Sequence, residues 1–196
     1  MSITQLARHS IVYGLGHILS RFITFLLLPI LTSSLSTMDF GAISKFYAFT
    51  GFAMAFYRYG MDTALMKFYI ENNNDQSYFS SIFFLQILSS LLFSFFLYLF
   101  SHYLSTWIFG FYNFKYMVYM ISIIFSDIVW NLNAITLRAE KKPVSYIVLN
   151  LINVSTILIL TIIYVNHLSM GIGGVLFANL FGSVLTLFFS LYILSQ

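Results

Sequence analysis

The chain has 196 residues, of which 60% are hydrophobic and 8% are charged, and its formal net charge is +3. A soluble domain carries about 25% charged residues, so this composition excludes a soluble globular fold and indicates an integral membrane protein. The absence of cysteine from the sequence excludes disulfide bridges, thiolate metal sites and a cysteine nucleophile.

Apolar runs along the chain predict membrane-spanning helices. Each spanning helix needs about 20 residues, and charged, Gly, Asn and Pro residues divide the runs. We therefore expect residues 1–196 to form one all-α, polytopic transmembrane lobe without a separate soluble domain. Six spans are predicted, at about 11–32, 43–66, 79–101, 115–137, 144–165 and 171–194.

The connections between these spans differ in charge. One group contains Arg8, Arg58 and the stretch "LRAEKKP", whereas the other has Lys115 as its only clear cation. Cytoplasmic loops of membrane proteins carry an excess of Lys and Arg. Both termini are therefore predicted to be cytoplasmic.

The first span carries polar residues at helical spacing. His17, Arg21 and Thr24 follow one another at steps of three or four residues, so they share one face of the helix. An arginine near the bilayer centre costs a few kcal/mol or more unless it faces protein or water. We expect Arg21 to face a cavity. The alternative is an ion pair with Asp127, the only acid well inside a predicted span.

Cations outnumber acids near the membrane. The cations are Arg21, Lys45 and Arg58, and the acid within a span is Asp127. Asp62 follows Arg58 by four residues and could pair with it. Positive charge left without a partner would suit an anionic substrate. The planar donor fork of arginine matches the oxygens of a pyrophosphate.

Further polar residues in the later spans are candidates to line the same cavity. Asn131 lies one turn after Asp127, and span five contributes Asn150 and Asn153. Asp62 and Arg138 are candidates for the inner mouth of the cavity. Span six is interpreted as a packing surface because small residues recur along it at steps of three or four: Gly171, Gly174, Ala178 and Gly182.

Motifs of enzyme chemistry are missing from the sequence. There is no G-x-S-x-G elbow, no H-E-x-x-H pair and no Gly-rich phosphate loop with its lysine. The four histidines lack the paired spacing of a metal site. A membrane glycosyltransferase would need grouped acids, and Asp127 is the only deep one. We therefore predict no enzyme activity, catalytic residue, metal, cofactor or nucleic-acid partner.

Several blocks resemble a known family. The stretch "GLGHILSRFITFLLLPILTSSLSTMDFG" has an arginine in span one followed by "LLLP" and a loop ending in "DFG", and "GMDTA" comes later. These features resemble the opening of the oligosaccharide flippases of the polysaccharide biosynthesis protein family, the O-antigen and capsule exporters of the MOP superfamily. "LRAEKKPVSYIVLNLINV" and "GIGGVLFANLFGSVL" resemble the family's stretch between spans four and five and its span six.

The resemblance implies a MATE-like fold of two six-helix lobes around a central cavity. Such a protein moves undecaprenyl-pyrophosphate-linked oligosaccharide units across the bacterial cytoplasmic (inner) membrane by alternating access, without ATP hydrolysis. Arg21 matches the cationic cavity residue of span one, and Arg58 with Asp62 falls near the inner mouth. The remaining polar candidates would meet the sugars: His17, Asn131, Asn150 and Asn153.

Family members usually have twelve to fourteen spans, about twice as many as here. Three explanations stay open: a truncated reading frame, a partial record of a longer chain, or a half-length protein that pairs in the lipid bilayer with a second copy or a separate C-terminal lobe. A polysaccharide polymerase or glycosyltransferases are further candidate partners. Two alternatives stay open. The chain could be a non-transporting scaffold of a polysaccharide machine, or a cation-coupled drug exporter of the same superfamily. A cavity with more acid and less arginine would favour the exporter.

Overall fold

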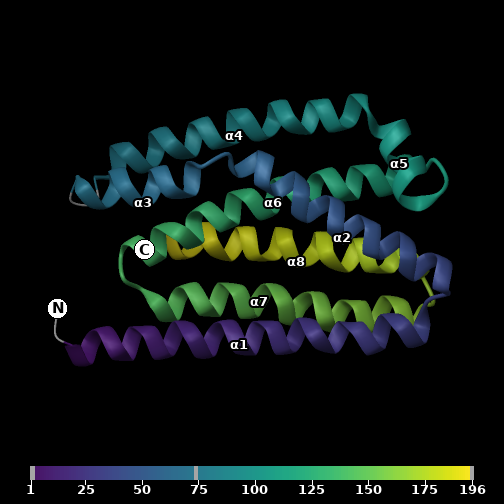
Figure 1. Cartoon of the computed structure of the whole chain (residues 1–196), viewed down its shortest axis with the longest axis horizontal. Coiled ribbons are helices and arrows are strands. Elements are labelled where there is room, and N and C mark those ends of the chain that lie inside the picture. The colour runs from purple at the N-terminus through teal and green to yellow at the C-terminus, as the bar shows by residue number, and fades with distance from the viewer. Residues whose placement is uncertain (1–2, 73–74, 195–196) are drawn as a thin grey trace.

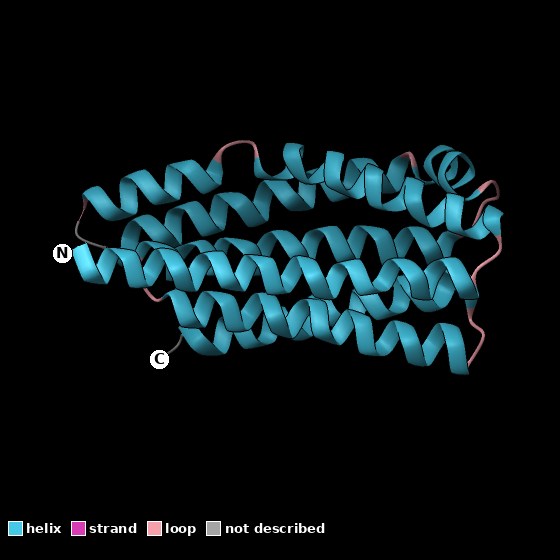
Figure 2. Ribbon diagram, turned by 60° about the horizontal axis from the view of Figure 1, so that its bottom comes forward, coloured by secondary structure: helices cyan, strands magenta, loops and turns pink. Residues whose placement is uncertain are grey.

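The computed structural model describes residues 3–72 and 75–194, with side chains described from residue 12 onward. The described residues form helices and no strand (Figure 2), which confirms the predicted all-α fold. The helices are α1 (Ile3–Ser34), α2 (Thr37–Arg58), α3 (Met61–Glu71), α4 (Gln76–Leu99), α5 (Ser101–Phe109), α6 (Phe114–Ala139), α7 (Pro143–Thr161), the π-helix η1 (Ile162–His167) and α8 (Gly171–Leu194).

Five helical segments among the described residues are long and apolar enough to cross a membrane, so the chain is a multi-pass membrane protein. Each coincides with a predicted span. They are Val12–Ser34, Gln76–Leu99, Phe114–Ala139, Pro143–His167 and Gly171–Leu194. The remaining predicted span, 43–66, begins within α2, whose 22 residues give the helix a length of about 33 Å. Asp39, Lys45 and Arg58 make α2 less apolar than these five.

The predicted span 43–66 is not one continuous helix. α2 ends at Arg58, and Tyr59 and Gly60 then have φ angles of 28° and 91°. This left-handed backbone stops the regular helical hydrogen bonding, and glycine adopts it without a steric penalty. α3 begins at Met61, and the break lies part-way along the bundle (Figure 1). The prediction of an unbroken helix was therefore wrong.

The core of the bundle forms around α6, which packs against α8, α4, α3 and α2 (Figure 1). The small residues of span six allow close packing, as their spacing predicts. Gly174, Ala178 and Gly182 are buried on α8. A Cβ atom on Gly182 would lie 2.6 Å from Cγ1 of Ile157, so only glycine permits this approach of α7.

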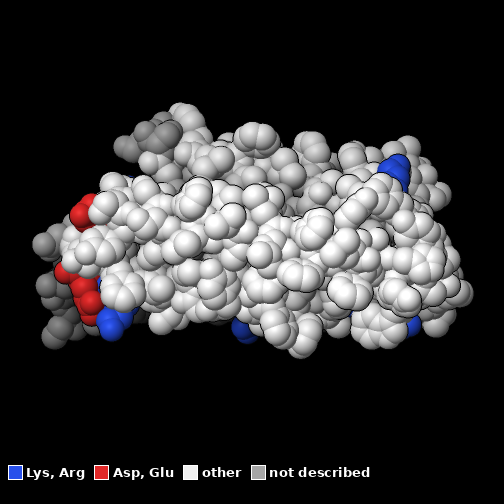
Figure 3. All heavy atoms as spheres, turned by 90° about the horizontal axis from the view of Figure 1, so that it is seen from above, with Lys and Arg blue, Asp and Glu red and all other residues white. Residues whose placement is uncertain are grey.

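The connections between helices lie at the two ends of the bundle. The two groups of connections that differ in charge in the sequence lie at opposite ends. The start of α1, the end of α3, the 139–143 connection and the end of α8 lie together, at what we call the α3 end (Figure 1). α5 and the α1–α2 and α7–α8 connections lie at the opposite, α5 end. Acidic side chains gather with basic ones at the α3 end, and a broad belt almost free of charge separates the ends (Figure 3). The side chain of Arg8 lies outside the described ones.

Candidate functional site

A cavity of about 590 Å³ lies between α1, α2, α6, α7 and α8. Leucines of α1 and branched aliphatic residues of α2 and α7 supply much of its wall. Each of the five helices also contributes at least one polar side chain. These polar residues are Thr24, Ser44, Tyr47, Asp127, Asn153 and Asn179. We refer to this space as the five-helix cavity.

Asp127 is the one charged residue that the structure places on the wall of the five-helix cavity. The indole N–H of Trp130, one turn later on α6, donates a hydrogen bond of 2.9 Å to Oδ1 of Asp127. The hydroxyl of Ser183 on α8 is a second hydrogen-bond partner of this carboxylate. Since donors from two helices hold it, the carboxylate has a fixed position at the cavity wall.

Amide groups supply the other strong polar atoms of the cavity. Nδ2 of Asn179 donates to the hydroxyl of Tyr47 at 2.9 Å and to the carbonyl of Val175 at 2.8 Å, which links α8 to α2. Nδ2 of Asn153 is buried and has no hydrogen-bond partner among the described residues. An unpaired buried donor costs about 1–3 kcal/mol. A polar ligand in the cavity would remove this cost.

Arg21 lies on the stripe of α1 that continues from the five-helix cavity. Thr24 and Leu28 line the cavity, and Arg21 precedes Thr24 by about one turn on the same face. Its side chain is exposed and makes no ion pair or hydrogen bond within the described part of the chain. The alternative of an Arg21–Asp127 ion pair is therefore wrong, because Asp127 is bonded to other neighbours.

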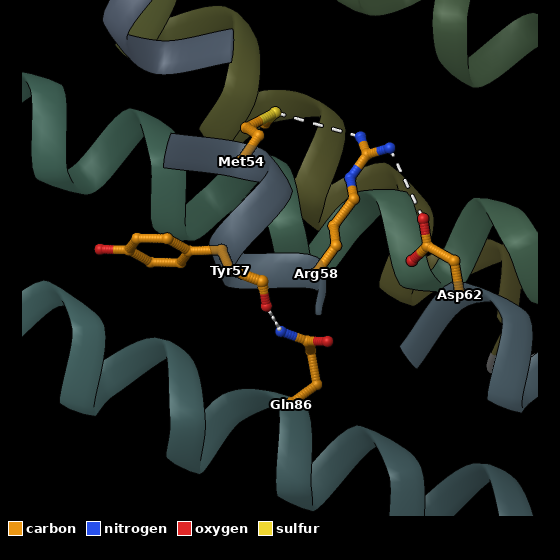
Figure 4. A network of polar contacts seen from close by, with 5 residues as sticks. All are labelled: Met54, Tyr57, Arg58, Asp62 and Gln86. Atoms are coloured by element: carbon orange, nitrogen blue, oxygen red, sulfur yellow. Dashed lines mark hydrogen bonds and ion pairs between the residues drawn. The ribbon is translucent and has the colours of Figure 1, made fainter. Parts of the chain in front are cut away.

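Arg58 and Asp62 form an ion pair across the helix break, as their spacing predicts. Nη1 of Arg58 lies 3.5 Å from Oδ2 of Asp62, and Nη2 lies 4.0 Å from Sδ of Met54 (Figure 4). Gln86 of α4 reaches the break from the other side, and its Nε2 donates to the carbonyl of Tyr57 at 2.7 Å (Figure 4). The pair therefore belongs to a broken helix inside the bundle.

Asp62 and Arg138 line one small pocket of about 230 Å³ toward the α3 end. The guanidinium of Arg138 lies 5.9 Å from the ring centroid of Tyr13 and 5.3 Å from that of Tyr146. The His17 ring lies 6.0 Å from the same Tyr146 ring. Cation–π contacts thus join α6 to α1 and α7 at this end. His17 belongs to this aromatic cluster, and the five-helix cavity lies farther along α1.

α3 is fastened to the same end by Tyr69. Its hydroxyl donates a hydrogen bond of 2.9 Å to Oε1 of Glu140, and Glu140 also pairs with Lys142 at 2.9 Å. Burial, together with the adjacent Glu140 carboxylate, raises the pKa of Tyr69 to about 12. The phenol therefore stays a hydrogen-bond donor at neutral pH.

A model of the family described as polysaccharide biosynthesis protein matches residues 6–196. The chain belongs to this family. The match covers all five helices of the cavity and both sides of the helix break, so the resemblance predicted from the sequence blocks is confirmed. No curated protein and no solved structure matches the chain.

In this member of the polysaccharide biosynthesis protein family, three predicted cavity residues lie elsewhere. The ammonium of Lys45 extends toward α5, 3.5 Å from the carbonyl of Trp107. Asn150 donates to the carbonyl of Tyr146 in its own helix at 2.8 Å. Asn131 is half-buried and does not line the five-helix cavity. Asn131 and Asn150 lie about one turn along their helices from Asp127 and Asn153, beyond the end of the cavity, whereas Lys45 is turned away from the cavity residue Ser44 by one position.

Three polar cavity residues were missed by the sequence analysis: Ser44, Tyr47 and Asn179. Span six was interpreted only as a packing surface, and no residue of α2 other than Lys45 and Arg58 was considered for the cavity. Their signal is weak but present. Tyr47 follows Ser44 by three residues on α2, and Asn179 is an amide inside the membrane-spanning helix α8. A buried amide needs hydrogen-bond partners, which indicates a polar neighbour.

Proposed function

We propose that the protein takes part in moving undecaprenyl-pyrophosphate-linked oligosaccharides across the bacterial cytoplasmic membrane by alternating access. The family membership and the multi-pass helical fold support this proposal. The observation that carries it is Arg21, a cation without a protein partner among the described residues, on the stripe that continues from a polar cavity. Its donor fork suits pyrophosphate oxygens.

The polar wall of the five-helix cavity suits the sugar part of this substrate. Asp127 and the hydroxyl of Tyr47 accept hydrogen bonds, and the amides of Asn153 and Asn179 offer both donors and acceptors. The protein acts in this proposal as a transporter and not as an enzyme. The exposed side chain of Arg21 favours a facing lobe.

In the proposed topology the α3 end faces the cytoplasm. The Lys and Arg residues of the 137–143 segment lie there, as the positive-inside rule requires of a cytoplasmic connection. Both termini are then cytoplasmic. Asp62 and Arg138 would lie nearest the cytoplasmic opening.

The test is transport by the full chain in liposomes with a fluorescent, short-chain polyprenyl-pyrophosphate disaccharide, followed by a membrane-impermeant quencher. Arg21→Ala should slow transport about tenfold or more, because a lost charge-assisted hydrogen bond costs about 1.5–3 kcal/mol. Lys115→Ala is the matched control, since Lys115 lies at the α5 end and stacks on Tyr119. Equal rates for Arg21→Ala and the wild type would contradict the proposal. Binding without transport by the wild type would favour the scaffold alternative.

One observation favours a second candidate, a cation-coupled exporter. Asp127 is the one charged side chain that the described residues place on the cavity wall, which is the pattern expected for cation binding. A carboxylate with neighbouring amide and phenol oxygens suits a monovalent or organic cation. Asp127→Asn should then abolish export of a cationic dye, whereas Arg21→Ala should leave it unchanged. Absence of dye export by the wild type, together with disaccharide transport that depends on Arg21, would support the oligosaccharide carrier.

A further inference from the structure

An apolar groove of about 330 Å³ runs between α2, α4 and α5, on a different side of α2 from the five-helix cavity. Its wall exposes no polar atom, because the hydroxyl of Tyr57 is hydrogen-bonded to Ser94 at 3.0 Å. Several residues of its wall are exposed on the surface of the bundle, so the groove opens outward. Six phenylalanines form most of its wall: Phe49, Phe52, Phe56, Phe93, Phe96 and Phe100.

A cation lies beside this groove. Lys45 precedes Phe49 by one turn of α2, and its ammonium lies 3.5 Å from the carbonyl of Trp107 on α5. Trp107 in turn lies one turn after Leu104, a residue of the groove wall. The Trp107 ring meets the Phe49 ring edge-on at 6.4 Å. Lys45 and Trp107 therefore lie beside the part of the groove that is nearest the α5 end.

The charge of Lys45 is not neutralised by an acid of the described residues. The hydrogen bond that its ammonium donates to the neutral carbonyl of Trp107 is long, at 3.5 Å. The acid nearest to Lys45 in the sequence of α2 is Asp39, whose carboxylate accepts a hydrogen bond of 2.8 Å from the hydroxyl of Ser36. An exposed ammonium with free donors next to a tryptophan is the arrangement of a membrane interface.

We propose that the groove binds one acyl chain of an anionic phospholipid whose phosphate contacts Lys45. The charge argues for this occupant. Hydrocarbon chains gain little by leaving bilayer hydrocarbon for an apolar groove, so any preference among lipids must come from the headgroup. A single lysine near the membrane surface favours an anionic headgroup over a zwitterionic one by about fivefold.

Trp107 provides a reporter for this site. It is 61% exposed, whereas Trp130, the other tryptophan, is 7% exposed and inside the bundle. The full chain would be reconstituted in phosphatidylcholine, and quenching of tryptophan fluorescence would be compared for chain-brominated phosphatidylglycerol and chain-brominated phosphatidylcholine. Phosphatidylglycerol should quench at about fivefold lower mole fraction. Equal quenching by the two lipids would overturn the proposal.

Charge variants locate the headgroup. Lys45→Gln should remove the preference for phosphatidylglycerol, and Lys45→Arg should retain it. Lys115→Gln is the matched control, because the ammonium of Lys115 lies 5.6 Å from the ring of Tyr119, outside the groove. An equal loss in Lys115→Gln would overturn the proposal, since the effect would then be one of general surface charge.

A second reporter locates the acyl chain. In a Phe96→Trp, Trp107→Phe double variant the exposed tryptophan lies in the groove wall. Quenching of this tryptophan by brominated phosphatidylglycerol should also weaken when Lys45 is changed to Gln. Quenching that is independent of Lys45 would overturn the placement of the chain. Displacement of phosphatidylglycerol by much smaller amounts of a polyprenyl pyrophosphate would overturn the assignment to a phospholipid.

Discussion

The side-chain amide of Gln86 on α4 donates a hydrogen bond of 2.7 Å to the main-chain carbonyl of Tyr57 near the end of α2. The last carbonyls of a helix lack partners within that helix, and α2 ends at Arg58. Hydrocarbon offers no water to satisfy them, so broken helices inside membranes depend on neighbouring side chains. Gln86, 2% exposed, performs this role for the break between α2 and α3.

Replacement of Gln86 by leucine should destabilise the protein. The carbonyl of Tyr57 would be left buried without a donor, at a cost of about 1–3 kcal/mol in the free energy of unfolding. Denaturant titration in bicelles, followed by fluorescence, would measure this cost. Ser89→Ala is the control, because the Ser89 hydroxyl donates to the carbonyl of Gln86 within its own helix, at 3.0 Å, and not to the break. Equal losses in the two variants would contradict this account.

The ion pair beside the break should contribute less than Gln86. The Arg58 and Asp62 side chains are 37% and 30% exposed and lie 3.5 Å apart. Partly exposed pairs contribute about 0–1 kcal/mol. A double-mutant cycle of Arg58→Ala and Asp62→Ala should therefore give a coupling energy below about 1 kcal/mol. A coupling energy above the cost of Gln86→Leu would show that the ion pair holds the break.

Two glycines of α1 should differ in their tolerance of alanine. A Cβ atom on Gly16 would lie 2.5 Å from Cγ1 of Ile147, so Gly16→Ala must push α7 away, whereas Gly14 has open space around it. Overpacking costs about 1–3 kcal/mol. Gly14→Ala should be neutral or stabilising, by up to about 1 kcal/mol, because alanine favours helix. The midpoint of thermal unfolding, Tm, would be measured for both variants in the same detergent. A fall in Tm for Gly14→Ala as large as that for Gly16→Ala would contradict the close approach of α1 and α7.

The spans were predictable from the sequence because length and apolar content alone determine them. The break at Tyr59 and Gly60 was not predicted, since one glycine in an apolar run is tolerated in many helices. The pairing of Arg58 with Asp62 followed from their spacing and is confirmed by the structure. The partner of the freed carbonyl, Gln86, comes from a different helix, and local sequence carries no information about that contact.

The cavity was predictable only in part, for the same physical reason. Asp127 and Asn153 could be proposed because polar groups within spans need partners, and both line the five-helix cavity. Lys45 carries a similar signal but extends toward α5. Choosing between the two sides of α2 requires the rotation of the helix against its neighbours. Spacing within α2 does not fix that rotation.

Cysteine substitutions on α1 should separate the cavity face from the lipid face. The chain contains no cysteine, so each variant has a single thiol. Thr24 lines the five-helix cavity, whereas Phe25, the next residue, is 64% exposed on another face of α1. Thiols react with charged reagents in water as thiolates. Cysteine at position 24, and at Arg21 one turn earlier, should react with a charged maleimide in intact liposomes.

Phe25→Cys is the matched control for this experiment. A thiol at position 25 would face hydrocarbon, which excludes the charged reagent, and should react only after the protein is denatured. Reaction at Thr24→Cys with protection at Phe25→Cys would show that water reaches the stripe on which Arg21 lies, as a pyrophosphate must. Protection at both positions would place this face of α1 against lipid or protein, and the oligosaccharide carrier would lose its route along α1.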